Sequence, residues 1–208
     1  MEKPKRTVDP EGKKEAILVA ATAAFARLGI EAASTADIAK TAGCGIGTVF
    51  RIFPTKENLI NAVFQRACEL HAHYHDKSKF DADDNTSPRE QFHRLFHTGV
   101  DMVEYHANEY LVFEQINRAE CLTELSNHMA AQLRRRIIRW LDRLRQNKAI
   151  INVSSDIVFA ITIGSFVRLV HETRRVKSIK PSEEFLASLE EVCWRGIVQD
   201  PAPNTDET

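Results

Sequence analysis

Two pairs of histidines stand at a spacing that could support metal chemistry. His71 precedes His75, and His93 precedes His97, by four positions. On a helix this spacing places both imidazoles on one face, where they can bind a metal ion. No motif such as H-E-x-x-H completes either ligand set. We therefore interpret these histidines as exposed and solvated and predict no metal site, although metal sensing or a pH effect by either pair stays open.

The sequence contains no common catalytic signature. There is no G-x-S-x-G elbow and no P-loop, and the glycines within residues 43–47 lack the spacing and the preceding strand of a dinucleotide fingerprint. No C-x-x-C pair occurs among the cysteines, which argues against a zinc ribbon or a disulfide framework and favours a reducing cytoplasm. We therefore predict neither enzymatic activity nor a cofactor.

The segment around these glycines could instead read DNA. Small residues at 43–47 would let a short helix, from Ile46 to Phe53, approach base edges closely in the major groove. Arg51 could donate two hydrogen bonds to guanine O6 and N7, and Ile46 could pack on a thymine methyl group. We predict that these two side chains read bases.

The elements needed to position such a helix precede it in the chain. Apolar residues recur at helical spacing almost everywhere and no stretch alternates with period two, so the pattern predicts an all-α protein. The first helix should end at Gly29, and a short second helix should run from a capping box at Ser34–Asp37 to Gly43. Two short helices around a tight turn are typical of a helix-turn-helix. The predicted buried residues are Ile17, Ala21, Ala24, Leu28 and Phe25 in the first helix and Ile38, Ala39 and Ala42 in the second.

Many residues of this segment have the identity and spacing of a known signature. They are Ile17-Leu18, Ala20-Ala21, Phe25, Leu28-Gly29, Thr35, Ile38-Ala39, Ala42-Gly43, Gly47-Thr48, Phe50, Phe53-Pro54, Lys56 and Leu59. Over about residues 13–60 the chain closely resembles the TetR family of bacterial transcriptional regulators, whereas the rest resembles it only in length and helix content. The resemblance implies an N-terminal three-helix helix-turn-helix domain and a C-terminal helical bundle for ligand binding and dimerisation. We place these at residues 1–55 and 56–200, with a disordered tail at 201–208.

The resemblance also assigns roles at the predicted DNA interface. Thr35, Thr48 and Lys56 match positions that bind phosphates. Gly45 stands where Ser is usual and Phe50 where Tyr is usual, so two contacts are lost, at about 1 kcal/mol and about tenfold in affinity each. Cys44 replaces a common Val, and we interpret it as a small core residue rather than a redox-sensitive thiol. The predicted DNA-binding residues are Thr35, Cys44, Gly45, Ile46, Gly47, Thr48, Phe50, Arg51 and Lys56, with Lys3, Lys5 and Arg6 as a loose basic arm.

The remaining chain is predicted to form helices separated by one polar loop. We expect helices at 56–74, 88–106, 108–119, 122–146, 154–176 and 182–198, and a loop with almost nothing to bury from Asp76 to Pro88. In the helix 122–146 the predicted apolar stripe is Leu122, Leu125, Met129, Leu133, Ile137, Trp140 and Leu144, opposite a solvated basic face of Arg134, Arg135, Arg139 and Arg143.

The last two helices carry more apolar surface than one partner can cover. Ile157–Val170 is apolar on nearly all sides, and Phe185, Leu189, Val192 and Cys193 form a stripe. The resemblance implies that these helices pair with their symmetry mates in a four-helix homodimer bundle. A purely intramolecular core is the alternative interpretation.

A small-molecule site in such a bundle would lie between the middle helices. Each apolar residue there is individually more typical of core than of a pocket. The candidate ligand-binding residues are Met102, Tyr105, Phe113, Ile116, Asn117, Met129 and Phe166, and the expected effector is apolar or amphipathic.

Composition limits the partners. The formal net charge is −1, so DNA binding must come from a local basic patch. No apolar run follows the N-terminus, and the longest one, Ile157–Val167, is far shorter than the roughly 20 residues of a bilayer span. We predict a cytoplasmic protein that binds a double-stranded DNA operator and no membrane.

The sequence therefore predicts a repressor. It would bind a palindromic operator as a dimer and release it on binding a ligand, through a shift between two dimer shapes. The alternative is a helical adaptor that binds proteins and not DNA, in which case Arg51, Thr48 and Lys56 would have no task.

Overall fold

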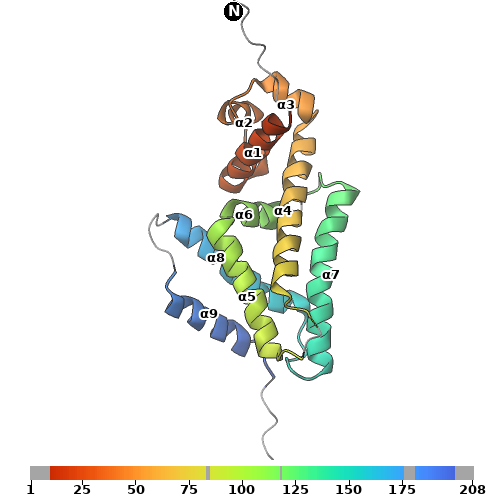
Figure 1. Ribbon diagram of the computed structural model, residues 1–208, viewed down its shortest axis with the longest axis vertical. Helices are drawn as coiled ribbons and strands as arrows, with labels where there is room; N and C mark the ends of the chain where they lie inside the picture. The colour runs from red at the N-terminus through yellow and green to blue at the C-terminus, as the bar shows by residue number, and fades with distance from the viewer. Residues whose placement is uncertain (1–9, 83–84, 118, 176–180, 200–208) are drawn as a thin grey trace, which may run out of the picture. The chain divides into compact units, whose positions relative to one another are not determined.

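Helices make up almost all regular structure in the described part of the chain, so the all-α prediction is confirmed (Figure 1). The computed structural model describes residues 10–82, 85–117, 119–175 and 181–199, with side chains in α8 described up to Leu169. The helices in these residues are α1 (Pro10–Ala32), α2 (Thr35–Thr41), α3 (Ile46–Ile52), α4 (Lys56–Ser78), α5 (Pro88–Tyr105), α6 (Ala107–Ile116), α7 (Glu124–Gln146), α8 (Ser155–Arg175) and α9 (Glu183–Arg195). An isolated antiparallel bridge joins Ile150 to Val198.

The chain divides into two compact units that do not follow the order of the sequence. The first unit comprises the chain up to Leu70 together with Asn108–Ala130, and the second comprises His71–Ala107 together with the chain from Ala131 onward. The first unit therefore holds α1–α3 and also most of α6. The predicted division at residues 55 and 56 stays a prediction, and the predicted basic arm and C-terminal tail lie outside the described residues.

α1 buries one face and ends near its predicted stop. Ile17, Ala21 and Phe25 are fully buried, and Gly29 interrupts the helical backbone with a φ of +77°. The predicted stripe is wrong at Leu28, which is 48% exposed. Because spacings of three and four from Ile17 lead to Ala21 and then Phe25, the buried face ends with the last full turn before Gly29.

The second unit is organised around α5, which contacts α8 and α9 (Figure 1). Gly99 lets α5 and α8 approach closely, because a Cβ built there would lie 2.7 Å from Cε2 of Phe166 in α8. Phe166 also packs on Phe96 with ring centroids 5.0 Å apart. This aromatic contact forms the centre of the α5–α8 packing.

The segment from Asp76 to Pro88 was predicted to bury almost nothing, and that prediction is wrong. α4 continues to Ser78, and the Phe80 side chain that follows is fully buried. The Phe80 ring meets Trp140 of α7 edge to face at 5.6 Å, and the guanidinium of Arg136 lies 5.4 Å from its centroid. A single aromatic residue in a polar segment anchors it, because one such side chain buries a large apolar area.

The apolar stripe of α7 is confirmed only in part. Leu133, Trp140 and Leu144 are buried, whereas Leu125, in the first turn of the helix, is 58% exposed. None of the described helices combines the length and the apolar character needed to cross a membrane.

Candidate nucleic-acid interface

A side-chain cap fixes the start of α2. Ser34 is the N-cap residue, and its hydroxyl accepts a hydrogen bond of 3.4 Å from the backbone N–H of Asp37. This confirms the predicted capping box signal at its first position. Ile38 and Ala39 are buried beneath the helix, so α2 holds its place by packing as well as by its cap.

The turn between α2 and α3 depends on one glycine. Gly43 has a φ of +66°, a conformation that residues with a Cβ rarely adopt. The backbone N–H of Cys44 bonds to the carbonyl of Ala39 at 3.0 Å and so closes the turn. The tight turn predicted between the two short helices is therefore present.

α3 buries the side chain of Val49 and exposes the residues that are predicted to read bases. Val49 is 1% exposed and holds the helix on the domain, whereas Ile46 and Phe50 are 47% and 44% exposed. Arg51 is also exposed. The predicted base-reading residues, Ile46 and Arg51, thus lie on the solvent-accessible part of one helix, where a DNA groove can reach them.

Gly45 and Gly47, at the start of α3, differ in their role from Gly43 in the turn. A Cβ at Gly45 or Gly47 would meet no atom within 4 Å, so neither is required by packing within this chain. Gly45 is the N-cap residue of α3 and provides no side-chain hydrogen bond. The Ser that the resemblance implies here could supply such a cap, so with Gly45 the first turn of α3 has no side-chain cap.

The predicted phosphate-binding residues lie at the starts of helices. Thr35 is the first residue of α2, Thr48 lies in the first turn of α3, and Lys56 is the first residue of α4. Lys56 Nζ donates a 3.1 Å hydrogen bond to the carbonyl of Glu31, which the sequence did not predict. This bond uses one of the three N–H donors of the Lys56 ammonium, so the others can still reach a phosphate. Cys44 is part-buried, which is intermediate between a core residue and an exposed, redox-sensitive thiol.

Comparison with known proteins identifies the family of the chain. Residues 17–63 match the family described as bacterial regulatory proteins, tetR family, and residues 64–199 match the family described as tetracyclin repressor-like, C-terminal domain. The chain belongs to the TetR family. It is a transcriptional regulator with a helix-turn-helix DNA-binding domain.

This TetR-family chain is similar to one relative in sequence over a short segment and to solved structures over most of its length. The HTH-type transcriptional regulator LuxR of Vibrio harveyi is 38% identical over 61 residues, which are 29% of this chain and 30% of that protein. A TetR family transcription regulator from Marinobacter aquaeolei VT8 has a TM-score of 0.75 at 19% identity, over 91% of this chain and 97% of that one. A TetR-family regulator from Shewanella sp. PV-4 has a TM-score of 0.67 at 17% identity, over 90% and 99% of the two chains. The solved structures share the fold.

The candidate ligand-binding residues fall in both units of the TetR-family fold. Phe113, Ile116, Asn117 and Met129 belong to the first unit, and Met102, Tyr105 and Phe166 belong to the second. Ile116, Met102 and Phe166 are buried, Phe113 stacks on Phe64 with centroids 5.6 Å apart, and Tyr105 is 66% exposed. Their assignment to a ligand site stays a prediction.

A buried amide in α4 was not predicted from the sequence. Asn61 donates hydrogen bonds to the carbonyls of Glu57 and Cys121, at 2.8 and 2.9 Å, and its Oδ1 accepts one from the N–H of Thr123 at 2.8 Å. Ser126 adds a fourth. The sequence signal is a polar residue flanked by Ile60 and Ala62, and it does not identify partners some sixty positions away.

The prediction of solvated histidines is wrong at His71 and His75, whereas the side chains of His93 and His97 are 46% and 44% exposed. His71 and His75 are each 6% exposed, and burial lowers the pKa of His71 to about 3 and of His75 to about 4. The proximity of His75 lowers the pKa of His71 further, and Arg136 acts on His75 in the same direction. Their face of α4 turns inward in the second unit, which the spacing alone does not reveal.

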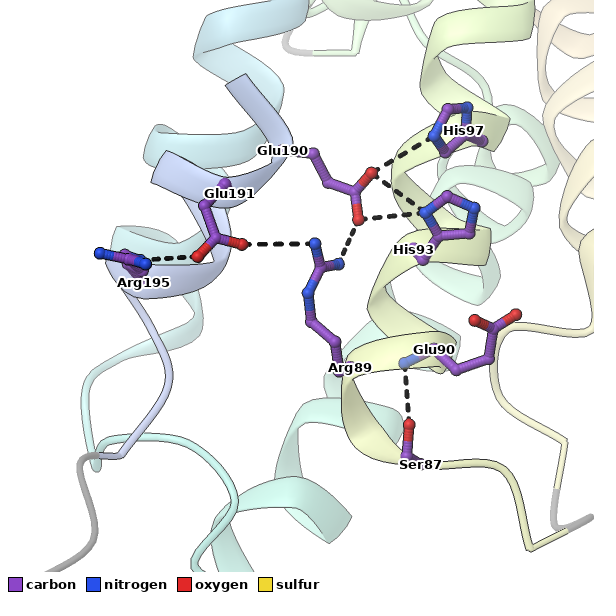
Figure 2. Close-up of polar contacts among 8 residues, drawn as sticks. All are labelled: Ser87, Arg89, Glu90, His93, His97, Glu190, Glu191 and Arg195. Carbon is purple, nitrogen blue, oxygen red and sulfur yellow. Dashed lines mark hydrogen bonds and ion pairs between the residues drawn. The ribbon is translucent and has the colours of Figure 1, made fainter. Parts of the chain in front are cut away.

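The second histidine pair faces a buried carboxylate. Figure 2 shows His93 and His97 of α5 pointing toward Glu190 of α9. Nδ1 of His93 lies 3.0 Å from Oε2 of Glu190, and Nε2 of His97 lies 3.3 Å from the same atom. Arg89 forms an ion pair with the other oxygen, Oε1. Burial raises the pKa of Glu190, but the hydrogen bonds and charges of Arg89 and His93 outweigh it, and the net shift is downward.

Proposed function

We propose that this TetR-family regulator is a cytoplasmic repressor that binds a palindromic operator as a homodimer and releases it on binding a small apolar or amphipathic effector. The observation that carries the proposal is the exposed face of α3. Ile46 and Phe50 lie there with about half of their surface in solvent, although both are apolar. An apolar side chain on a recognition helix is suited to contact a thymine methyl group.

Arg51 is the side chain with the chemistry to choose a base. It is exposed, and no ion-pair partner for it exists among the residues that the structure describes. A guanidinium without a competing carboxylate can donate two parallel hydrogen bonds to guanine O6 and N7. Thr35, Thr48 and Lys56 would supply phosphate contacts that position the helix and specify no sequence.

Dimerisation is supported by the two faces of α9. Glu190 and Cys193 are buried toward the second unit, whereas Phe185 and Val192, seven positions apart on the opposite face, are 51% and 67% exposed. Ile157 of α8 is also 49% exposed. A surface helix with an apolar stripe in solvent is typical of a protein interface. A second copy of the chain that covers α8 and α9 would bury this stripe.

A dimer explains how short helices reach useful affinity. Two α3 helices related by a two-fold axis read two half-sites about one turn of DNA apart, so a palindrome matches the symmetry of the protein. Linking two weak half-site contacts raises the overall affinity without any new contact. We propose α8 and α9 as the dimer helices for this reason.

Release by an effector requires a connection from the middle helices to α4. Within the first unit, Asn61 holds α4 to the segment that connects α6 to α7, through Cys121 and Thr123, and to the first turn of α7, through Ser126. A ligand that moves this segment must therefore move α4 with it, and α4 follows α3 directly in the chain. The proposed effector acts by favouring the dimer shape in which the two α3 helices no longer fit the operator.

The experiment that tests the proposal is selection of bound sequences from a random duplex DNA pool by the purified full-length protein. We expect a palindrome to be enriched. Binding to that palindrome, followed by fluorescence anisotropy, should weaken steeply as salt increases, because each phosphate contact releases counterions. Absence of an enriched sequence together with salt-independent association with protein partners would favour a helical adaptor instead.

A further inference from the structure

We propose that His93, His97 and Glu190 form a zinc site that joins α5 to α9. The proposal concerns a surface of the second unit separate from the DNA-reading helices, and it does not depend on the proposed operator or effector. It rests on the geometry of three donor atoms, the burial of the carboxylate and the accessibility of the imidazoles.

Two of the three donor separations are already close to those around a tetrahedral ion. Nδ1 of His93, Nε2 of His97 and a carboxylate oxygen of Glu190 all lie within 4.8 Å of one another. The two nitrogens are 3.0 and 3.3 Å from Oε2 of Glu190. An ion about 2.1 Å from each donor in tetrahedral geometry separates the donors by about 3.4 Å. Small side-chain movements are therefore enough to admit the metal.

Two elements bring these donors together. His93 and His97 occupy successive turns of α5, and their ring centroids are 4.3 Å apart, so both imidazoles present an edge to one point (Figure 2). Glu190 comes from the facing side of α9, and α5 contacts α9. Because α9 is 13 residues long, a bond from the metal to Glu190 would fix the helix near its middle.

The Glu190 carboxylate is buried and held in place from one side. The Glu190 side chain is 5% exposed, and Arg89 contacts its Oε1, which leaves Oε2 directed at the two imidazoles. Arg89 also contacts Glu191 at 3.5 Å, and Arg195 pairs with Glu191 at 2.6 Å, so this side of the cluster is fixed by two arginines. A buried carboxylate favours a further cation, and hydrogen bonds from a neighbouring residue orient a metal ligand in the same way.

The ligand set and its exposure indicate the metal. Two imidazoles and one carboxylate suit zinc and related transition metals rather than calcium or magnesium, which prefer oxygen ligands. The His93 and His97 side chains are 46% and 44% exposed, so an ion can enter from solvent and a water molecule can occupy the fourth position. Three protein ligands with one open position form a recognised zinc arrangement.

The test is a zinc titration of the untagged, chelator-treated full-length protein in competition with a chromophoric chelator. We expect one strong site per chain, lost or weakened at least about tenfold in His93→Gln and in His97→Gln. Both histidines are partly exposed, so these variants should fold, and circular dichroism checks that they do. Glu190→Gln should weaken zinc in the same way but is the less decisive variant, because it also removes the ion pair with Arg89.

The matched control is His73→Gln. His73 is an exposed histidine of α4 outside the cluster, and its replacement should leave zinc binding unchanged. Cobalt(II) in place of zinc should give the visible absorption of a tetrahedral ion without the sulfur charge-transfer band that a cysteine ligand would add. The proposal is overturned if the wild-type protein binds no zinc at micromolar concentration, or if both His93→Gln and His97→Gln bind it as tightly as the wild type.

Discussion

Ser126 Oγ, in the first turn of α7, donates a 2.7 Å hydrogen bond to Oδ1 of Asn61 in α4. Asn61 is 4% exposed, and its amide makes three further hydrogen bonds, to Glu57, Cys121 and Thr123. Both donor hydrogens and both acceptor positions of the side chain are thus satisfied. A fully bonded buried amide admits one arrangement of its partners, so the start of α7 and the first half of α4 hold a fixed relation within the first unit.

Replacing Asn61 by Ala should lower the free energy of unfolding by about 2–4 kcal/mol, because buried partners lose their hydrogen bonds as well as a packed side chain. Denaturant unfolding of wild type and variant gives the difference. Asn127→Ala is the matched control, since Asn127 is exposed and makes one 3.3 Å bond to Leu122, and its effect should stay within about 0.5 kcal/mol. Equal effects of the two substitutions would mean that the network does not stabilise the fold.

The helix-turn-helix could be predicted from the sequence because its signals are local. Ser34, Gly43 and the apolar spacing around Ile38 each act within one or two helical turns, and the structure places each of them as predicted. The boundaries of the later helices also agree within a few residues, since they too depend on periodicity and caps.

The contacts that could not be predicted join residues distant in the chain. Glu190 lies 97 positions from His93, and Asn61 lies 65 positions from Ser126. No local pattern specifies such pairs, so the histidines of α5 were interpreted as solvated. The buried Phe80 is a related case, because a polar segment hides one aromatic anchor whose partner, Trp140, belongs to α7.

Arg51→Ala should weaken binding to the selected operator by about 1–3 kcal/mol and relax the preference at one base pair per half-site, because a bidentate contact to guanine is lost. Anisotropy titrations against the operator and its single-base variants measure both effects. Arg139→Ala removes an exposed arginine of α7 and should change neither. Uniform weakening on every DNA sequence would instead assign Arg51 to phosphate binding.

Val192→Glu should convert the proposed dimer into monomers, with the dissociation constant raised at least about tenfold, because each dimer would bury two carboxylates in an apolar seam. Light scattering coupled to size exclusion gives the mass at several concentrations. Val19→Glu is the matched control, since Val19 is an exposed valine of α1, 53% exposed against 67% for Val192. If Val192→Glu remained dimeric, the interface would lie away from the exposed face of α9.

The buried histidines of α4 make stability depend on pH. Burial holds the pKa of His71 at about 3 and of His75 at about 4 in the folded protein, with Arg136 opposing the charged form of His75 and with Asp81 and Asp76 favouring it. An unfolded chain has histidines of pKa about 6.5, so below that pH it takes up protons that the folded chain does not. The histidine contribution to stability is therefore complete above about pH 6.5 and is lost progressively as the pH falls toward the folded values.

Between about pH 7 and about pH 5, each of these histidines should lower the free energy of unfolding by about 1–2 kcal/mol. Denaturant unfolding at both pH values gives the difference, and it should shrink in His71→Gln and in His75→Gln, because glutamine does not titrate. His73→Gln removes an exposed histidine of the same helix and should leave the difference unchanged. The comparison is made within each variant, so a variant that is less stable at both pH values still tests the prediction. An undiminished difference in both buried-site variants would show that other groups cause the loss of stability in acid.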